Sequence, residues 1–199
     1  MFIVLEGSDC AGKTTQAKRL ADRLRDTTGR EVLHLSFPSD TYAGTLARDC
    51  IGNAPALLIQ SVMTIDKYAF ASQIRTCLRK GGIVVSDRWT QSAEVYGVED
   101  GLDHDWLLKI HENLPFADLN ILLDLDVATI CSRLKERGFP PERYENGMCQ
   151  ARIVSGYRNL WSVYSKTPFG QDAWPVVDAT HTADVIHEEL FKLACQFLR

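Results

Sequence analysis

The sequence predicts an α/β fold in which a parallel sheet of about five strands is covered by helices on both faces. Short apolar runs alternate along the 199 residues with longer segments in which apolar residues recur at helical spacing. One of these runs, 83–85, is apolar at every position, which is typical of a strand buried on both faces of a parallel sheet. Glycine or proline separates most of the segments, as expected at the ends of helices.

The pattern predicts the elements in the following order. Strands are expected over 2–5, 31–37, 83–85, 119–125 and 174–177, and helices over 14–25, 43–51, 55–80, 102–114, 127–137, 145–165 and 184–197. Pro55 is well suited to begin the longest helix, and Gly81-Gly82 ends it. We expect one domain over 1–199, because the apolar content of 45% suffices for a single core and no linker or repeat divides the chain.

The composition narrows the class of protein. A net charge of −4, from 26 acidic and 22 basic residues, argues against a broad nucleic-acid-binding surface. The six cysteines have no C-x-x-C or zinc-site spacing and are expected to be reduced thiols. No apolar stretch approaches ~20 residues, and the first residues already form a strand, so neither a membrane span nor a signal peptide is expected. We therefore expect a cytoplasmic protein.

The first strand leads into the motif Gly7-Ser8-Asp9-Cys10-Ala11-Gly12-Lys13-Thr14. Its spacing, G-x-x-x-x-G-K-[ST], is that of a P-loop, whose backbone N–H groups surround the phosphates of a nucleoside triphosphate. We expect Lys13 to reach the β- and γ-phosphates and the Thr14 hydroxyl to bind Mg²⁺. The dipole of the following helix favours the same phosphates. The predicted cofactor-binding residues are Gly7, Ser8, Cys10, Ala11, Gly12, Lys13, Thr14 and Thr15.

A second group of polar residues follows the central strand 83–85. Asp87 is expected to hold Mg²⁺ or to act as a base, and Arg88 to clamp a phosphate with two hydrogen bonds. The same two residues are also consistent with a structural ion pair at a strand end. Three neighbours, Trp89, Ser92 and Tyr96, are candidates for the wall of a base pocket.

Basic residues surround the sequence 138–141, Gly-Phe-Pro-Pro. Arg133, Lys135 and Arg137 precede it and Arg143 follows it, which is consistent with a lid over 133–147 that closes arginines onto transferring phosphates. A solvated helix face is the alternative interpretation. Because Cys10 carries no charge, an arginine that stabilises the transition state has to come from outside the P-loop, and Arg137 and Arg143 are the candidates.

The ordered set of motifs resembles the thymidylate kinase family along nearly the whole chain. The matching segments are the P-loop from Leu5 to Gln16, Phe37-Pro38, Asp66-Lys67, Asp87-Arg88-Trp89 with Ser92, Arg137-Gly138, the run from Glu142 to Gly147, and the run from Val177 to Thr180. The resemblance implies the three-layer P-loop kinase fold and an enzyme that uses ATP and Mg²⁺ to phosphorylate a nucleoside monophosphate. Many members are homodimers.

The resemblance also implies roles for individual residues. Lys13 and the loop backbone hold ATP, Arg88 contacts the transferring phosphates, and Asp9 lies near the acceptor sugar and the metal. Arg137 or Arg143 completes the charge in the lid, and Ala179 and Thr180 border the adenine. The predicted acceptor-binding residues are Phe37, Met63, Lys67, Arg88, Trp89, Ser92, Tyr96 and Tyr144.

Three acceptor-site features depart from the family. Family members carry an arginine for the acceptor phosphate shortly after Phe-Pro, whereas Ser39-Asp40 stands here. The base-reading arginine is replaced by Lys67, which lacks the planar fork of arginine. Met63 takes the position of the aromatic residue that stacks on thymine. These changes leave the acceptor open.

Three functions are therefore consistent with the sequence. In the first, the enzyme phosphorylates dTMP or a modified pyrimidine deoxynucleotide, with Arg88 and Arg48 at the acceptor phosphate. In the second, the acceptor is the hydroxyl of a 5-hydroxymethylpyrimidine, in a nucleoside or in DNA, and Asp40, Asp9 or Asp87 acts as base. In the third, the protein binds nucleotide without catalysis, which the presence of Asp87-Arg88 and of the basic lid disfavours.

Overall fold

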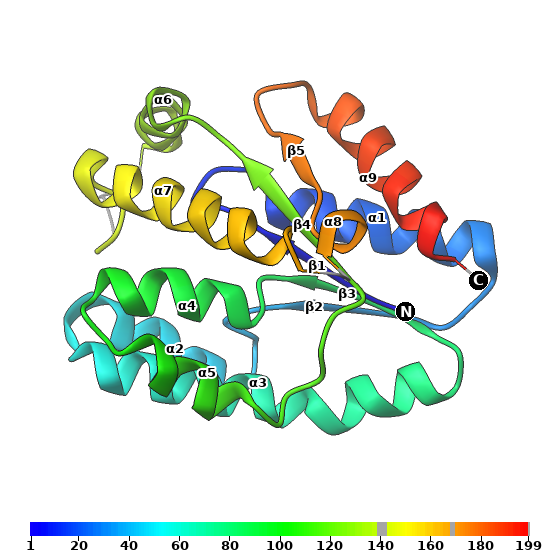
Figure 1. Cartoon of the computed structure of the whole chain (residues 1–199), viewed down its shortest axis with the longest axis horizontal. Coiled ribbons are helices and arrows are strands. Elements are labelled where there is room, and N and C mark those ends of the chain that lie inside the picture. Colours follow the sequence, from blue (N-terminus) through cyan, green and yellow to red (C-terminus); the bar gives the residue numbers. More distant parts are fainter. Residues whose placement is uncertain (139–142, 168–169, 199) are drawn as a thin grey trace.

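The computed structural model describes residues 1–138, 143–167 and 170–198 and has one sheet of five strands (Figure 1). The strands are β1 (Phe2–Glu6), β2 (Val32–Ser36), β3 (Ile83–Asp87), β4 (Leu119–Asp124) and β5 (Val176–Asp178). All neighbours pair in parallel, in the order β2-β3-β1-β4-β5. The predicted five-stranded parallel sheet is confirmed.

Helices cover both faces of this sheet (Figure 1). Their bounds in the described residues are α1 (Lys13–Thr28), α2 (Tyr42–Asn53), α3 (Ala56–Arg79), α4 (Thr90–Glu99), α5 (His104–His111), α6 (Val127–Arg137), α7 (Gly147–Tyr164), α8 (Gly170–Ala173) and α9 (Ala183–Phe197). Helices α1 and α9 lie side by side, whereas α2 to α5 form a separate layer. Among the described residues, none of these helices has the length and apolar character needed to cross a membrane.

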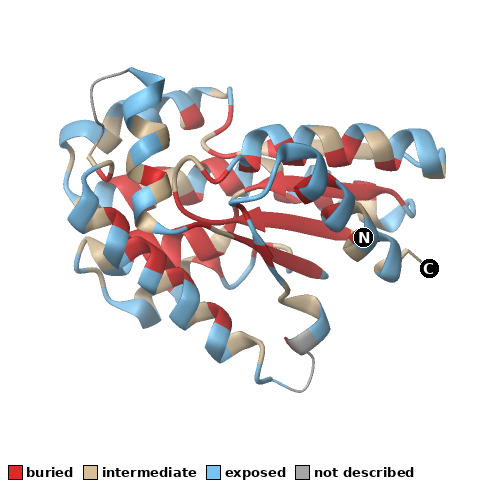
Figure 2. Ribbon diagram, turned by 90° about the horizontal axis from the view of Figure 1, so that it is seen from above, coloured by how far each residue is buried: buried red, intermediate tan, exposed pale blue. Residues whose placement is uncertain are grey.

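The alternation of side chains along each strand explains the two layers. Ile3 and Leu5 of β1 belong to the cluster that contains Leu20 of α1 and Leu190 of α9. Phe2, Val4 and the adjacent Val84 belong to the cluster that contains Ile74 of α3 and Trp89. Figure 2 shows the resulting buried sheet between helices that bury one side each. Side chains alternate along a strand, so Glu6 points to the same face of the sheet as Phe2 and Val4. On that face it contacts Ser92 of α4.

Several boundaries differ from the sequence prediction. Helix α4 was not predicted, because every residue from Gln91 to Gly97 is buried and the segment has no polar face to reveal its period. Strand β3 continues through Ser86 to Asp87, so Asp87 is part of the sheet. The last strand begins at Val176 instead of residue 174, because Trp174 stacks on Tyr164 with ring centroids 4.4 Å apart.

The replacement Ile186→Ala is expected to lower the free energy of unfolding by about 2–5 kcal/mol, because it leaves a cavity between α9 and the sheet. Ile186 is 4% exposed, whereas its neighbour Val185 is 50% exposed. Val185→Ala is the matched control and is expected to cost about 0.5 kcal/mol. Equilibrium urea denaturation measures both values, and equal losses in the two variants would contradict the assigned packing of α9.

Candidate active site

The P-loop occupies the carboxyl end of β1, between the sheet and α1. Gly7 has a φ of +145°, and a Cβ atom there would lie 2.5 Å from the carbonyl oxygen of Leu123. Gly12 has a φ of +85° at the start of α1. Both positions therefore require glycine, one because of space and both because of their conformation. The loop leads directly into the N-terminus of α1, whose free N–H groups favour anions.

Lys13 lies folded into this loop. Its buried ammonium donates a hydrogen bond of 2.6 Å to the carbonyl oxygen of Ser8. Burial, together with the nearby Arg88 cation, lowers its pKa to about 8, although Asp87 and Asp9 act in the opposite direction.

Thr14 and Asp87 lie beside each other, one from α1 and one from the end of β3. The Thr14 hydroxyl donates to Asp87 Oδ2 at 2.5 Å, and the Ser36 hydroxyl donates to the same oxygen at 3.3 Å. Asp87 Oδ1 is buried and has no hydrogen-bond partner among the described residues. A buried carboxylate oxygen without a partner next to a threonine hydroxyl is consistent with a site for Mg²⁺, which prefers oxygen ligands.

Arg88 follows β3 in a left-handed conformation, with a φ of +68°. Its Nη2 donates to Asp9 Oδ1 at 2.7 Å and to the Tyr96 hydroxyl at 3.2 Å. Its Nη1 donates at 3.2 Å to the carbonyl oxygen of Gly7. Burial alone would raise the pKa of Asp9, but the Arg88 and Lys13 cations outweigh it and lower that pKa. Arg88 and Asp9 therefore form a charged pair at the edge of the P-loop.

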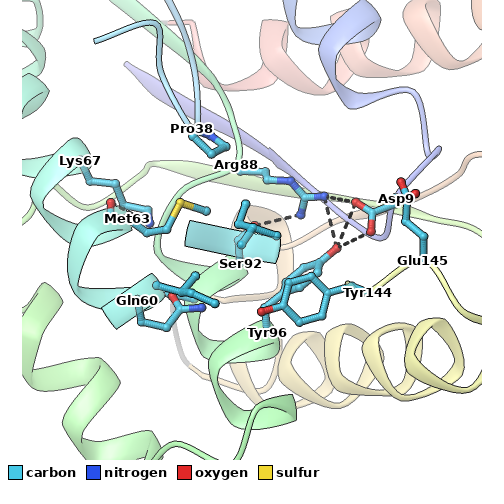
Figure 3. A pocket seen from close by; sticks show the side chains of 13 residues that line it. Asp9, Pro38, Gln60, Met63, Lys67, Arg88, Ser92, Tyr96, Tyr144 and Glu145 are labelled. Carbon is cyan, nitrogen blue, oxygen red and sulfur yellow. Dashed lines mark hydrogen bonds and ion pairs between the residues drawn. The ribbon is translucent and has the colours of Figure 1, made fainter. Parts of the chain in front are cut away.

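A cavity of about 170 Å³ opens next to this pair (Figure 3). It is lined by Asp9, Pro38, Ile51, Ile59, Gln60, Met63, Lys67, Arg88, Ser92, Ala93, Tyr96, Tyr144 and Glu145. In Figure 3, Gln60, Met63 and Lys67 approach it from one helix, while Asp9 and Glu145 lie at its opposite end. The cavity has an apolar wall with charged groups at both ends, a combination that suits a nucleotide.

Most of the predicted acceptor-binding residues meet at this cavity. Met63, Lys67, Arg88, Ser92, Tyr96 and Tyr144 line it. Phe37 and Trp89 are not among the lining residues, because they pack on each other behind the wall with ring centroids 5.1 Å apart. Asp40 is not brought to the cavity either. Its side chain is fully exposed, with the carboxylate 3.7 Å from Arg48.

The arginines of the predicted lid contact different parts of the protein. Residues 139–142 lie outside the described residues. Arg137 forms an ion pair with Glu145, and Arg143 forms one with Asp100 at 3.2 Å. Arg133 reaches the P-loop directly, because it donates to the carbonyl oxygens of Cys10 at 3.0 Å and Ala179 at 3.1 Å.

The remaining predicted cofactor-binding residues lie close to the loop. Ala11 and the Ser8 side chain are buried, while Thr15 is exposed in the first turn of α1. Ala179, which is buried, and Thr180 follow β5, and Arg133 links this segment to the P-loop. The structure thus brings the segment predicted to border adenine next to the loop predicted to hold phosphate.

Sequence reasoning missed several residues of the site. Gln60 is one helical turn before Met63 and two before Lys67, so extending the spacing along α3 would have found it. Gln150 donates to Asp9 Oδ2 at 2.9 Å from α7, and nothing in the sequence near it signals this contact. Glu6 and Tyr157, which contact Ser92, were likewise not predicted.

The replacement Lys67→Met is expected to stabilise the protein at pH 7 by on the order of 2 kcal/mol. Burial lowers the pKa of Lys67 from 10.5 to about 8, so below pH 8 the folded protein holds a charge that the unfolded chain solvates better. As pH rises from 8 toward 10.5, the folded lysine loses its proton first, and the stability of the wild type approaches that of the variant.

Urea denaturation at pH 7 and pH 9.5 measures this difference. Lys18→Met, at an exposed position of α1, is the control and should show no such dependence on pH. A Lys67→Met variant that is less stable than the wild type at both pH values would contradict the buried charge.

The family model and similar known proteins point to the same family. The family model described as thymidylate kinase matches residues 5–190. A probable thymidylate kinase of Pyrococcus horikoshii is 32% identical over 207 aligned positions, which cover 96% of this chain and 94% of that protein. A probable thymidylate kinase of Methanococcus maripaludis is 33% identical over 161 positions, covering 80% and 76%.

The fold is shared with a solved thymidylate kinase from Candida albicans. The TM-score is 0.79 at 23% identity, over 98% of this chain and 91% of that one. The family model, the relatives and the P-loop geometry agree, and the chain therefore belongs to the thymidylate kinase family and is an ATP-dependent P-loop nucleotide kinase.

Proposed function

We propose that the enzyme transfers the γ-phosphoryl group of ATP to the phosphate of dTMP, giving dTDP. One observation carries the proposal: Arg88 lines the acceptor cavity and also hydrogen-bonds the P-loop at Gly7 and Asp9. A guanidinium at the junction of the two sites can contact both the donated phosphoryl group and the phosphate that receives it. Phosphoryl transfer depends mainly on such positioning and charge stabilisation.

The cavity supports a pyrimidine as the acceptor base. Lys67 is buried, and among the described residues its ammonium makes only a long hydrogen bond, 3.4 Å to the carbonyl oxygen of Met63. It therefore retains donors for the carbonyl oxygens that a pyrimidine presents. The amide of Gln60 lies on the same helix face, and the Met63 thioether packs adaptably against a flat ring.

Thr14 and Asp87 are the residues that would hold Mg²⁺, because Asp87 Oδ1 is buried without a partner among the described residues. The ion would neutralise charge on the phosphates of ATP. Lys13 then exchanges the Ser8 carbonyl for a phosphate oxygen, and Arg133 holds the P-loop to the segment at Ala179. Arg137 and Arg143 are proposed lid arginines of the segment 133–147.

The acceptor phosphate is already a nucleophile, so it requires cations instead of a base. Arg88 supplies one. Arg48 of α2 is a candidate for the second, because it donates at 2.8 Å to the carbonyl oxygen of Pro38, a residue that lines the cavity. The comparisons give no support to a hydroxyl acceptor or to DNA modification. Of the three carboxylates considered as its base, Asp40 is exposed, Asp9 pairs with Arg88 and Asp87 accepts from Thr14.

We also propose that the enzyme is a homodimer that pairs through α3. Leu57, Ile65 and Tyr68 are exposed and share one face of this helix, and Leu108 of the neighbouring α5 is exposed as well. A stripe of large apolar side chains on one face is typical of a protein interface.

A transfer assay with γ-labelled ATP and Mg²⁺ tests the reaction. The wild type is expected to label dTMP, and to leave thymidine and hydroxymethylated DNA unlabelled. Lys13→Ala is expected to abolish transfer, because it removes the cation of the P-loop. Lys18→Ala, five residues further along α1 at an exposed position, is the control and should be as active as the wild type. Label on thymidine or DNA but not on dTMP would refute the proposed acceptor.

The dimer is tested by light scattering coupled to size-exclusion chromatography. Ile65→Asp is expected to convert the wild-type dimer into a monomer, because it places a charge in the apolar stripe. Val163→Asp, at an exposed position of α7, should remain dimeric. A wild-type protein that is monomeric at all concentrations tested would rule out this interface.

A further inference from the structure

Glu6 is a fully buried carboxylate at the end of β1 whose hydrogen-bond donors in the described residues are all neutral. Glu6 Oε1 accepts from the backbone N–H groups of Trp89 at 2.7 Å and Ser92 at 3.1 Å. Glu6 Oε2 accepts from the hydroxyls of Ser92 at 2.6 Å and Tyr157 at 2.9 Å. A buried charge is tolerated only when its lone pairs are satisfied in this way.

Two of these bonds cap helix α4. The helix begins after Trp89, whose own side chain forms no cap. Glu6 satisfies the N–H groups of Trp89 and Ser92 from a different element, and its negative charge lies at the positive end of the helix dipole. The carboxylate therefore fixes the first turn of α4 against β1, and with it the position of Ser92.

The other two bonds orient hydroxyls toward Arg88. The hydroxyls of Ser92 and Tyr157 each lie 3.2 Å from Arg88 Nη1 and accept from it. The two hydroxyls also lie 3.0 Å from each other, and a hydroxyl that gives its single proton to Glu6 Oε2 turns its lone pairs to the guanidinium. Nη1 is thus connected to a buried negative charge through two hydroxyls and also bonds to the carbonyl oxygen of Gly7.

The edge of the guanidinium formed by Nε and Nη2 has other partners than Nη1. Nη2 donates to Asp9 and to the Tyr96 hydroxyl, and Nε has no hydrogen-bond partner among the described residues. Figure 3 shows this edge directed at Asp9, with Ser92 on the other side of the guanidinium. Nε and Nη2 can bind two oxygens of one phosphate side by side when a phosphate oxygen takes the place of Asp9 on Nη2.

We propose that Glu6 is a positioning residue, which acts through the hydroxyls of Ser92 and Tyr157 to fix Nη1 of Arg88 and to aim the Nε–Nη2 edge at the transferring phosphoryl group. The inference rests on the proposed function. The guanidinium lies at the end of a long side chain with several rotatable bonds, so its direction depends on the contacts that hold it. Losing them should affect the transition state more than the binding of ATP.

Tyr157→Phe is the sharpest test, because it removes one hydroxyl and keeps a ring that packs against Tyr96 and Trp161. We expect kcat for dTMP to fall roughly 10-fold with an unchanged KM for ATP. Tm is expected to fall by several degrees, as in the control below, because the buried Glu6 loses one of its donors. Tyr164→Phe is the matched control. It removes a Tyr–Glu hydrogen bond of the same length, 2.9 Å to Glu94, that has no contact with Arg88, and should leave kcat unchanged.

A double-mutant cycle separates positioning from a structural role. In an Arg88→Ala background, Tyr157→Phe is expected to cause no further loss of kcat, because the group that it orients is absent. An equal loss in both backgrounds would overturn the proposal. Ser92→Ala should behave like Tyr157→Phe. Glu6→Gln should lose more than either, and the two hydroxyl variants keep the test valid if Glu6→Gln does not fold.

The assays of the wild type and of Tyr157→Phe distinguish a failure of the proposed function from a failure of the role given to Glu6. A wild-type enzyme that does not label dTMP would contradict the proposed function. A wild-type enzyme that labels dTMP while Tyr157→Phe retains full kcat would contradict only the role of Glu6 and its two hydroxyl partners.

Discussion

The parallel pairing of β1 with β3 is the constraint on which the site depends. Leu5 lies opposite Asp87, and the N–H group of Arg88 donates to the carbonyl oxygen of Leu5 at 2.9 Å. Since parallel strands end at the same edge of a sheet, the residues that follow them meet there: the P-loop after β1 and Arg88 after β3. The donor loop and the arginine of the acceptor cavity are therefore joined by backbone hydrogen bonds, which side-chain motion does not disturb.

Several charged side chains gather at this edge of the sheet, and the carboxylates there do not fully offset the cost of burying the lysines. Glu6, Asp9 and Asp87 face the cations of Lys13 and Arg88 within a few side chains of one another. Lys13 and Lys67 nevertheless have a pKa of about 8, well below that of a solvated lysine, because burial outweighs the nearby carboxylates. Phosphate groups would supply the missing negative charge. We infer that the site trades stability of the free protein for affinity toward anionic ligands.

The parts of the site that the sequence predicted are those with local signals. The P-loop spacing indicated Lys13 and Thr14, and a polar pair after an apolar run indicated Asp87 and Arg88. Glu6 and Tyr157 are 151 positions apart, and the bond between them depends on how α7 packs, which no local pattern encodes. The same holds for α4, whose burial on all sides removes the periodicity by which a helix is recognised in a sequence.

The structure of the segment after Phe37 explains how this chain tolerates Asp40 in the region where the family carries an arginine. Ser39 donates to Asp66 through its N–H group at 2.7 Å and through its hydroxyl at 2.5 Å, so the segment is fastened to α3 next to Lys67. Asp40 is directed away from this anchor into solvent, with its carboxylate toward Arg48. An exposed acid is well screened and adds little repulsion inside the cavity. Arg48 in turn contacts the segment at Pro38. On the proposed function, the cation for the acceptor phosphate comes from α2, and the substitution changes which element supplies the charge without placing an acid in the cavity.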